Sequence, residues 1–226
     1  MDANIFKKKS VWIFDLDNTI YEPETKIFDQ IDQRMKTFIS EKIFIPKEEA
    51  LILQKKYYKK YGTTLYGLMK NHNIDPDEFL DFVHNIDLEN LKENRELHKK
   101  IKALPGTKII YTNGEKEYAK KVLNALGIKD LFIDIWDIKS SKFIPKPEIG
   151  PLKNYLFENT FKAEDCVYFE DLKKNLLPGH QLGLTTIYIS NEASIETDFY
   201  IDFRFKTIIS ALDMINKNIL RRNNVK

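Results

Sequence analysis

The sequence predicts an α/β fold in which a mostly parallel sheet is interrupted by a long helical insertion. Three observations lead to this prediction. After about residue 103, short apolar runs alternate with stretches of helical periodicity, which is typical of a parallel sheet covered by helices. Residues 21–102 show helical periodicity and little sign of strands. One strand-like run, at residues 11–14, precedes this segment, so we expect a core from residues 1–20 and 103–226 and a helical insertion from residues 21–102.

The core elements follow from runs of β-branched and aromatic residues separated by helix and turn signals. Residues 11–14 are expected to form a buried first strand, and residues 107–112 the second. A helix over residues 116–126 ends at Gly127, a residue type suited to the C-terminal end of a helix. The remaining strands are predicted at 132–136, 166–170 and 185–189, and the remaining helices at 149–158 and 172–182.

Two features predict helices in the insertion. One helix has an apolar stripe at helical spacing, formed by Phe28, Ile31, Met35, Phe38 and Ile39. A second helix is expected to start at Asp75 and Pro76, which are residue types preferred at the N-cap and the first helical position, with Glu78 as the capping-box partner.

Composition gives no sign of a nucleic-acid or membrane partner. The 36 Lys and Arg residues nearly balance the 34 Asp and Glu residues, for a formal net charge of +2. No apolar stretch approaches the roughly 18 residues that a bilayer-spanning helix needs, and the apolar run near the N-terminus is too short for a signal peptide. The one cysteine, Cys166, lies in a predicted strand and is expected to be a buried core residue. We therefore expect a cytoplasmic protein that binds neither polymeric nucleic acid nor membranes.

Polar residues follow four of the predicted strands. They are Asp15 and Asp17 after the first, Thr112 and Asn113 after the second, Lys146 in the loop after the third, and Glu170 and Asp171 at the end of the fourth. Each signal alone is weak, because Asn-Gly is an ordinary turn and an acidic pair is often a helix cap. In a parallel sheet, however, the carboxyl ends of the strands meet at one edge, where ligands bind. The joint occurrence therefore predicts a polar site at that edge.

A site with two aspartates, a threonine, a lysine and a further acidic pair suits phosphoryl transfer. A carboxylate can attack phosphorus and form an aspartyl-phosphate. Mg²⁺, a hard cation that prefers oxygen ligands, and the lysine offset the repulsion between phosphate and carboxylates. A hydroxyl and backbone N–H groups hold the remaining phosphate oxygens, and a second carboxyl can give a proton to the leaving oxygen and later take one from water. The sequence therefore predicts Mg²⁺ as the cofactor and a small phosphorylated metabolite as the partner.

These residues resemble the four motifs of the haloacid dehalogenase-like hydrolase superfamily. Asp15-Leu16-Asp17-Asn18-Thr19 is similar to motif I, Thr112 to motif II, Lys146 to motif III, and Glu170-Asp171 to motif IV. The resemblance implies a Rossmann-like core with a helical C1 cap inserted between motifs I and II.

The same resemblance implies a role for each of these residues. Asp15 is the nucleophile, and Asp17 is the general acid and base. The phosphate-binding residues are Thr112, Asn113 and Lys146. The groups implied to hold Mg²⁺ are Asp15, the main-chain carbonyl of Asp17, Asp171 and Glu170.

Five segments look like the pyrimidine 5′-nucleotidase branch of that superfamily. They are Asn18-Thr19-Ile20-Tyr21, residues 25–28, 57–68 and 84–87 of the insertion, and residues 169–176. This resemblance implies hydrolysis of a pyrimidine nucleoside monophosphate, with Tyr61 and Thr64 as the residues that contact the base or sugar. The alternative is that the tyrosines of residues 57–68 only pack the insertion. His84 is expected to be structural rather than catalytic.

Several other functions remain open from the sequence. A phosphatase or phosphomutase acting on a sugar phosphate or on phosphoglycolate would use the same core residues. A dehalogenase is disfavoured, because halide leaves without a proton and Asp17 would have no task. A signalling domain phosphorylated on aspartate would have its motifs in a different order and would leave the helical insertion unexplained. A catalytically silent binding module is disfavoured because all the polar groups that catalysis needs are present. The oligomeric state is open between a monomer and a weak dimer.

Overall fold

Six parallel strands form one sheet in the computed structural model, which describes residues 3–191 and 198–220. The strand order is β3-β2-β1-β4-β5-β6. The strands are β1 (Val11–Phe14), β2 (Thr107–Tyr111), β3 (Asp134–Trp136), β4 (Cys166–Glu170), β5 (Thr185–Ile189) and β6 (Phe203–Phe205). The first strand of the chain lies in the middle, where it pairs with β2 on one side and β4 on the other. The predicted α/β fold is confirmed.

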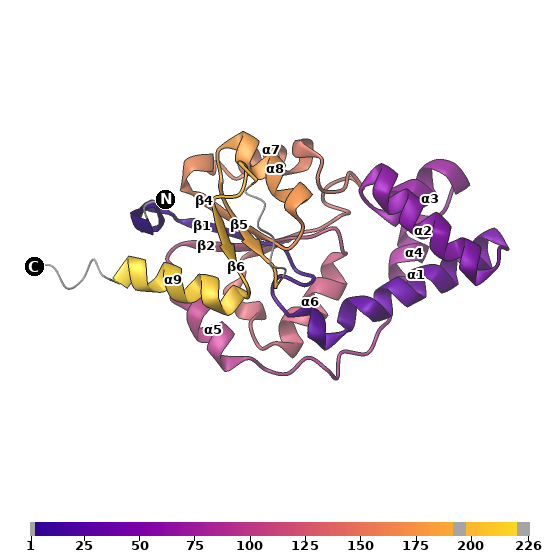
Figure 1. Ribbon diagram of the computed structural model, residues 1–226, viewed down its shortest axis with the longest axis horizontal. Helices are drawn as coiled ribbons and strands as arrows, with labels where there is room; N and C mark the ends of the chain where they lie inside the picture. Colours follow the sequence, from indigo (N-terminus) through magenta and orange to yellow (C-terminus); the bar gives the residue numbers. More distant parts are fainter. Residues whose placement is uncertain (1–2, 192–197, 221–226) are drawn as a thin grey trace, which may run out of the picture.

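Helices cover both faces of this sheet. Successive side chains of a strand point to opposite faces, so one apolar strand packs against helices on both sides. On one face, Trp12 and Phe14 share an apolar cluster with α5 (Arg95–Lys102), α6 (Lys116–Ala125) and α9 (Ile208–Leu220). On the other face, Val11 and Ile13 share a second cluster with α7 (Ile149–Glu158) and α8 (Lys173–Leu182). The three layers are visible in Figure 1. All four residues of β1 are buried, as expected for a central strand covered on both faces.

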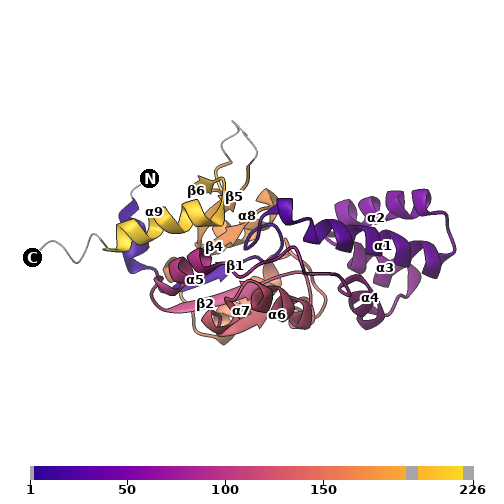
Figure 2. The same ribbon diagram turned by 90° about the horizontal axis from the view of Figure 1, so that it is seen from below.

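The helical insertion lies beside the sheet rather than on either face (Figures 1 and 2). It consists of α1 (Ile27–Ile43), α2 (Lys47–Tyr61), α3 (Thr64–His72) and α4 (Pro76–Val83). α1 packs against α2 and α4, and α2 packs against α3. The predicted stripe of α1 faces the interior of this bundle, since Ile31, Phe38 and Ile39 are buried and Phe28 and Met35 are partly buried.

The start of α4 follows the expected chemistry at its cap. The Asp75 carboxylate accepts hydrogen bonds from the backbone N–H groups of Asp77 at 2.8 Å and Glu78 at 3.1 Å. These bonds satisfy two of the N–H groups that a helix start leaves without partners. The Glu78 carboxylate pairs with Lys42 of α1 instead of completing a capping box, so it joins two helices of the insertion.

The helix α5 packs on the core and not on the insertion. Its buried residues Leu97 and Ile101 belong to the cluster under the sheet, and α5 contacts α9. The Asn216 amide of α9 donates a hydrogen bond to the main-chain carbonyl of Lys100 at 3.0 Å. We therefore propose that the helical insertion ends before α5, rather than at residue 102, because an apolar helix face shows that a helix is buried but not against which partner.

The sequence predicted no element beyond residue 189, where the structure has β6 and α9. All three residues of β6 are only partly buried, so this edge strand lacks the continuous apolar run that marked the central strands. Four short 3₁₀ helices complete the described elements: η1 (Ala3–Lys8), η2 (Pro23–Thr25), η3 (Lys129–Leu131) and η4 (Ala163–Asp165). Among the described helices, none combines the length and the apolar character that crossing a membrane requires.

Candidate active site

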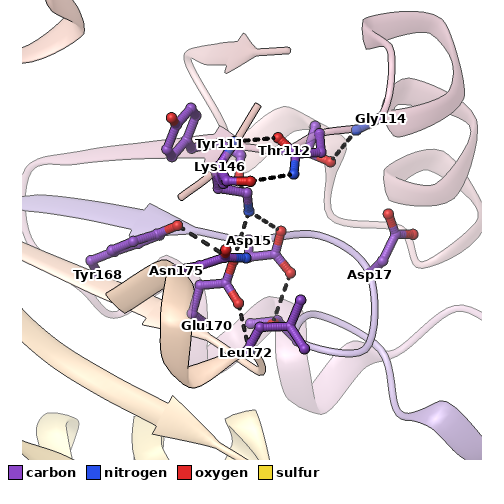
Figure 3. A network of polar contacts seen from close by, with 12 residues as sticks. Asp15, Asp17, Tyr111, Thr112, Gly114, Lys146, Tyr168, Glu170, Leu172 and Asn175 are labelled. Carbon is purple, nitrogen blue, oxygen red and sulfur yellow. Dashed lines mark hydrogen bonds and ion pairs between the residues drawn. The ribbon is translucent and has the colours of Figure 1, made fainter. Parts of the chain in front are cut away.

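Four of the polar residues predicted at the strand ends, Asp15, Thr112, Lys146 and Glu170, lie together at the carboxyl edge of the sheet (Figure 3). Asp15 directly follows β1, Thr112 directly follows β2, and Glu170 is the last residue of β4. Because β1 pairs with both β2 and β4, these three positions are neighbours. Lys146 reaches the same point from the loop after β3. The topology therefore brings together residues that are far apart in the sequence.

Lys146 is the centre of the hydrogen-bond network. Its ammonium donates to Asp15 Oδ1 at 2.5 Å, to Glu170 Oε1 at 2.8 Å and to the main-chain carbonyl of Tyr111 at 3.1 Å. The side chain is only 3% exposed. Burial alone would lower the pKa of Lys146, but the charges of Asp15 and Glu170 outweigh burial and hold the pKa well above its usual value. The lysine is therefore a fixed positive charge beside Asp15.

Glu170 holds Lys146 in place. Glu170 Oε1 accepts hydrogen bonds from Lys146 and from the Asn175 amide at 2.6 Å, and Oε2 accepts one from the Leu172 N–H at 2.8 Å. Its side chain is fully buried. Both oxygens already accept hydrogen bonds from the protein, so Glu170 supplies charge to a cation site more readily than it supplies a free ligand atom.

Asp15 is buried and bonded at both oxygens. Oδ1 accepts from Lys146, and Oδ2 accepts from the Thr19 hydroxyl at 3.0 Å. The Asp15 N–H donates to the Phe169 carbonyl at 3.0 Å, which extends the backbone pairing of β1 with β4 by one residue. Burial raises the pKa of Asp15, and the charge of Lys146 partly offsets this rise. The carboxylate is thus held in one orientation by donors from two other segments.

A cluster of three carboxyl groups fits a divalent cation. Oxygen atoms of Asp15, Glu170 and Asp171 lie within 4.8 Å of one another. Lys146 partly offsets their charge, but burial, followed by the charges of Glu170 and Asp15, raises the pKa of Asp171 to about 10. A hard cation with oxygen ligands would relieve this repulsion, and Mg²⁺ is typically bound by one or two carboxylates. The donor set therefore suits Mg²⁺.

The Asp17 carboxylate is separate from this cluster. It turns away from Lys146 and Glu170 (Figure 3), and its Oδ1 accepts hydrogen bonds from the Tyr21 hydroxyl at 2.5 Å and the Tyr118 hydroxyl at 2.7 Å. Burial and the neighbouring Asp17 raise the pKa of both phenols well above its usual value, so both stay protonated as donors. The two aspartates of the motif therefore have different surroundings.

Thr112 and Asn113, both predicted to bind phosphate, differ in their contacts. The Thr112 hydroxyl oxygen accepts a hydrogen bond from the Gly114 N–H at 2.9 Å, which leaves the hydroxyl proton for a ligand. The Asn113 side chain instead pairs with the main chain of Lys146: its Oδ1 accepts from the Lys146 N–H at 2.9 Å, and its amide donates to the Lys146 carbonyl at 3.4 Å. Asn113 therefore positions the loop of Lys146.

A cavity of about 310 Å³ separates these residues from the helical insertion. Asp15, Asp17, Thr112 and Lys146 line its floor. The insertion contributes seven apolar residues, namely Phe28, Ile31, Met35, Leu65, Phe79, Leu80 and Val83, and seven polar ones, namely Asp32, Gln54, Lys55, Tyr58, Thr63, Thr64 and His84, and most of the surface that lines the cavity is apolar. The site is therefore formed by both parts of the chain.

Thr64 and Tyr61, the two insertion residues expected to contact substrate, differ in their position relative to the cavity. Thr64 lines the cavity and donates its hydroxyl proton to the Gln54 carbonyl at 3.2 Å. Tyr61 is not part of the cavity wall; its hydroxyl lies 3.3 Å from the Asn71 amide, and Tyr58 lines the cavity in its place. Tyr61 and Tyr57 pack together with ring centroids 5.8 Å apart. Packing therefore describes Tyr61 better than substrate contact.

Comparison with known proteins assigns the chain to a family. The sequence profile described as haloacid dehalogenase-like hydrolase matches residues 10–183, which include the insertion and the four polar segments of the site. The chain belongs to this haloacid dehalogenase-like hydrolase family.

One relative of this hydrolase is named as a phosphatase. Glyceraldehyde 3-phosphate phosphatase of Methanocaldococcus jannaschii is 27% identical over 223 residues, covering 92% of this chain and 96% of the relative. Phosphate metabolism protein 8 of Saccharomyces cerevisiae is 31% identical over 136 residues, covering 55% of this chain and 42% of the yeast protein. The crystal structure of a HAD phosphatase from Thermococcus onnurineus superposes with a TM-score of 0.63 at 18% identity, covering 92% of this chain and 97% of that one, which shows a shared fold.

Sequence reasoning assigned no contact at the site to four residues that lie around it in this hydrolase. Tyr118 contacts Asp17 across 101 positions of sequence, and nothing in the local pattern of α6 marks it. Tyr58 and Gln54 line the cavity from α2, and His84 lines it from the end of α4. The spacing of Gln54 and Tyr58, four residues apart on one helix, places them on a common face, but the sequence does not show which face meets the core.

Proposed function

We propose that this hydrolase is a Mg²⁺-dependent phosphomonoesterase that works through an aspartyl-phosphate on Asp15. The observation that supports this proposal is the position of Asp15. This buried residue lines the cavity, and its Oδ1 accepts a hydrogen bond from the Lys146 ammonium at 2.5 Å. A fixed positive charge at this point offsets the negative charge that a phosphate brings toward the carboxylate. The family and its phosphatase relatives agree with this chemistry.

The two steps use the two aspartates differently. In the first step an Asp15 oxygen forms a bond to phosphorus while the bond to the ester oxygen breaks, and Asp17 gives that oxygen a proton. In the second step water attacks phosphorus, Asp17 takes a proton from the water, and the bond between Asp15 and phosphorus breaks. Lys146 and the Thr112 hydroxyl bind the phosphoryl oxygens. A Mg²⁺ ion held by Asp15, Asp171 and the main-chain carbonyl of Asp17, with Glu170 beside it, would supply positive charge to the phosphoryl group.

We infer that the substrate is a pyrimidine nucleoside monophosphate. The upper wall of the cavity is mostly apolar, with Phe28, Met35 and Phe79 among its residues, and such a wall suits a planar base better than a chain of hydroxyl groups. A second candidate is glyceraldehyde 3-phosphate, because the relative that matches nearly the full length of the chain bears that name.

Phosphate release from a substrate panel tests the proposal. The panel contains UMP, CMP, AMP, glyceraldehyde 3-phosphate, a hexose phosphate and phosphoglycolate, each with Mg²⁺ and with a chelator. We expect kcat/KM for the pyrimidine nucleotides to exceed that for the triose phosphate by about tenfold or more. A preference for glyceraldehyde 3-phosphate would select the second candidate, and an isomerised sugar phosphate without free phosphate would indicate a mutase.

Substitution of the nucleophile separates catalysis from binding. Asp15→Asn is expected to lower kcat by about 10³-fold or more, because an amide cannot form the aspartyl-phosphate. Asp130→Asn, an exposed aspartate in η3, is the matched control and should keep wild-type turnover. Phosphate release by Asp15→Asn at the wild-type rate would contradict the mechanism. A wild-type protein that takes up phosphate once without turnover would be a signalling or binding domain.

A further inference from the structure

The second aspartate of the site is held by two tyrosines from different parts of the chain. Tyr21 lies in the segment after β1, and Tyr118 lies on α6. Both hydroxyls donate to the same atom, Asp17 Oδ1, at 2.5 and 2.7 Å, and the two phenol oxygens lie 3.2 Å apart. Tyr21 is 4% exposed and Tyr118 is 1% exposed. These hydrogen bonds therefore join buried side chains in the protein interior.

The geometry distinguishes the two oxygens of Asp17. A phenol carries one hydroxyl proton, and here both protons point to Oδ1. Two donors saturate that oxygen and fix the plane of the carboxylate, so a proton that Asp17 carries is placed on Oδ2. Asp17 lines the cavity together with Asp15, so this residue borders the space that a substrate would occupy.

We propose that Tyr21 and Tyr118 are positioning residues that orient Asp17 so that Oδ2 delivers the proton to the leaving oxygen. This inference rests on the proposed function, in which Asp17 is the general acid. In that step the proton moves from Asp17 Oδ2 to the ester oxygen as its bond to phosphorus breaks, and the phenols keep their own protons. Neither tyrosine touches the phosphoryl group in this account.

The helical insertion supports Tyr118 from the other side. The His84 ring, at the end of α4, stacks on the Tyr118 ring with centroids 4.4 Å apart and an interplanar angle of 4°. His84 Nδ1 lies 3.4 Å from the Glu115 carboxylate, and Lys139 joins Glu115 at 3.2 Å to Asp77 of α4 at 2.6 Å. The stack therefore links the insertion to the core residue that holds Asp17.

Leaving groups of different basicity test this inference. The alkoxide of a nucleotide or sugar phosphate needs a proton to leave, whereas p-nitrophenolate leaves without one. The measurement is kcat/KM, which covers the steps up to release of the leaving group, for p-nitrophenyl phosphate and for the alkyl phosphate that the wild-type enzyme hydrolyses best. We expect Tyr118→Phe and Tyr21→Phe to lower kcat/KM for the alkyl phosphate by about tenfold or more through kcat, with KM little changed. The value for p-nitrophenyl phosphate should stay near wild type.

Two reference variants make the result decisive. Asp17→Asn should show the same selectivity for leaving group, only larger. Tyr155→Phe removes a similar hydrogen bond, from Tyr155 to Asp134 at 3.1 Å on the α7 side of the sheet, and should change neither substrate. If Asp17→Asn is selective and the two tyrosine variants lower both substrates equally or neither, the positioning role is wrong while the proposed function stands. If Asp17→Asn itself is not selective, the acid role of Asp17 fails, and this inference fails with it.

A second pair of variants tests the contribution of the insertion. His84→Ala removes the ring that covers Tyr118 and should reproduce the selective loss of alkyl phosphate hydrolysis. His84→Phe keeps a flat ring at the same place and should restore it. An unselective loss in His84→Ala, or the same loss in both variants, would contradict the role of the stack.

Discussion

At the scale of single residues, the site depends on how Lys146 is held. Its ammonium is bonded to Asp15, Glu170 and the carbonyl of Tyr111, and its main chain is bonded to Asn113. These partners lie at or just after the ends of β1, β2 and β4, so the ends of three neighbouring strands fix one residue. Burying an ammonium is costly without such partners, and removing one of them would leave a buried charge uncompensated. Lys146 therefore also links the carboxyl ends of three strands.

Asp171 provides a prediction about metal and pH. In the folded protein without metal its pKa is raised to about 10 from the value of 3.8 that an unperturbed aspartate has. The folded state then holds the proton more tightly than the unfolded state, so this group makes the free energy of unfolding fall as pH rises from about 4 toward 10. Asp171→Asn removes the ionisation, and we expect it to stabilise the chelator-treated protein at pH 8 by about 1 kcal/mol or more.

Urea unfolding with and without Mg²⁺ measures this effect. Mg²⁺ should stabilise the wild type, because it binds the folded state, and should have little effect on Asp171→Asn. At pH 4 without metal the two proteins should differ less than at pH 8. Asp130→Asn again serves as the control. If Asp171→Asn is less stable than wild type at pH 8 in chelator, burial and the neighbouring carboxylates do not raise the pKa of Asp171 as described.

At the scale of elements, the contact between α2 and α3 depends on a glycine. A Cβ atom added at Gly67 of α3 would lie 2.5 Å from both Cβ and Cγ of Tyr57 of α2. Tyr57 cannot easily move away, because its hydroxyl is bonded to His72 at 2.6 Å and its ring is buried. The two helices therefore approach more closely than any residue other than glycine would allow.

Gly67→Ala is expected to destabilise the protein by about 1–3 kcal/mol, because overpacking forces helices apart. The matched control is Gly150→Ala near the start of α7, where nothing lies within 4 Å of the added Cβ. The control should be unchanged or slightly more stable, by less than about 1 kcal/mol, since alanine favours a helix over glycine. Thermal or urea unfolding measures both. Equal stability of the two variants would mean that α2 and α3 are not packed as closely as described.

At the scale of the whole molecule, the sequence predicted the parts that have local signals. The strands β1 to β5 were predicted because runs of β-branched and aromatic residues mark strands that are largely buried. Asp15, Thr112, Lys146 and Glu170 were placed at one edge because a parallel sheet aligns its carboxyl ends. Two contacts were not predictable: the packing of α5 on α9 and the hydrogen bond from Tyr118 to Asp17. Each joins segments about a hundred residues apart, and the local sequence of a segment does not indicate which distant segment it contacts.

An ion pair between Lys139 of the core and Asp77 of α4 joins the insertion to the core, which gives a prediction for the whole molecule. Lys139 of the core contacts Asp77 of α4 at 2.6 Å and Glu115 at 3.2 Å. Lys139→Ala should lower stability by no more than about 1 kcal/mol, because exposed ion pairs contribute little. It should raise KM, with kcat near wild type, because the insertion loses a contact that holds it over the cavity.

Steady-state kinetics at low and high salt check this effect. Salt screens exposed charges, so raising it should increase KM of the wild type more than KM of Lys139→Ala. Lys42→Ala, which breaks a pair between α1 and α4 inside the insertion, is the control and should leave KM unchanged. An unaltered KM in Lys139→Ala would show that these pairs do not hold the insertion.

Gly62, between α2 and α3, limits how the two parts of this chain could be recombined. Its backbone has a φ of +86°, and an added Cβ would lie 3.0 Å from the Lys146 carbonyl and 3.4 Å from Pro145. The main chain of the insertion at Gly62 thus touches the loop that carries Lys146. A helical unit transplanted from another enzyme of this family would fit here only if it presented an equally small residue at this point. Substrate range can therefore change by substitution of wall residues on α1, α2 and α4 more readily than by exchange of the whole insertion.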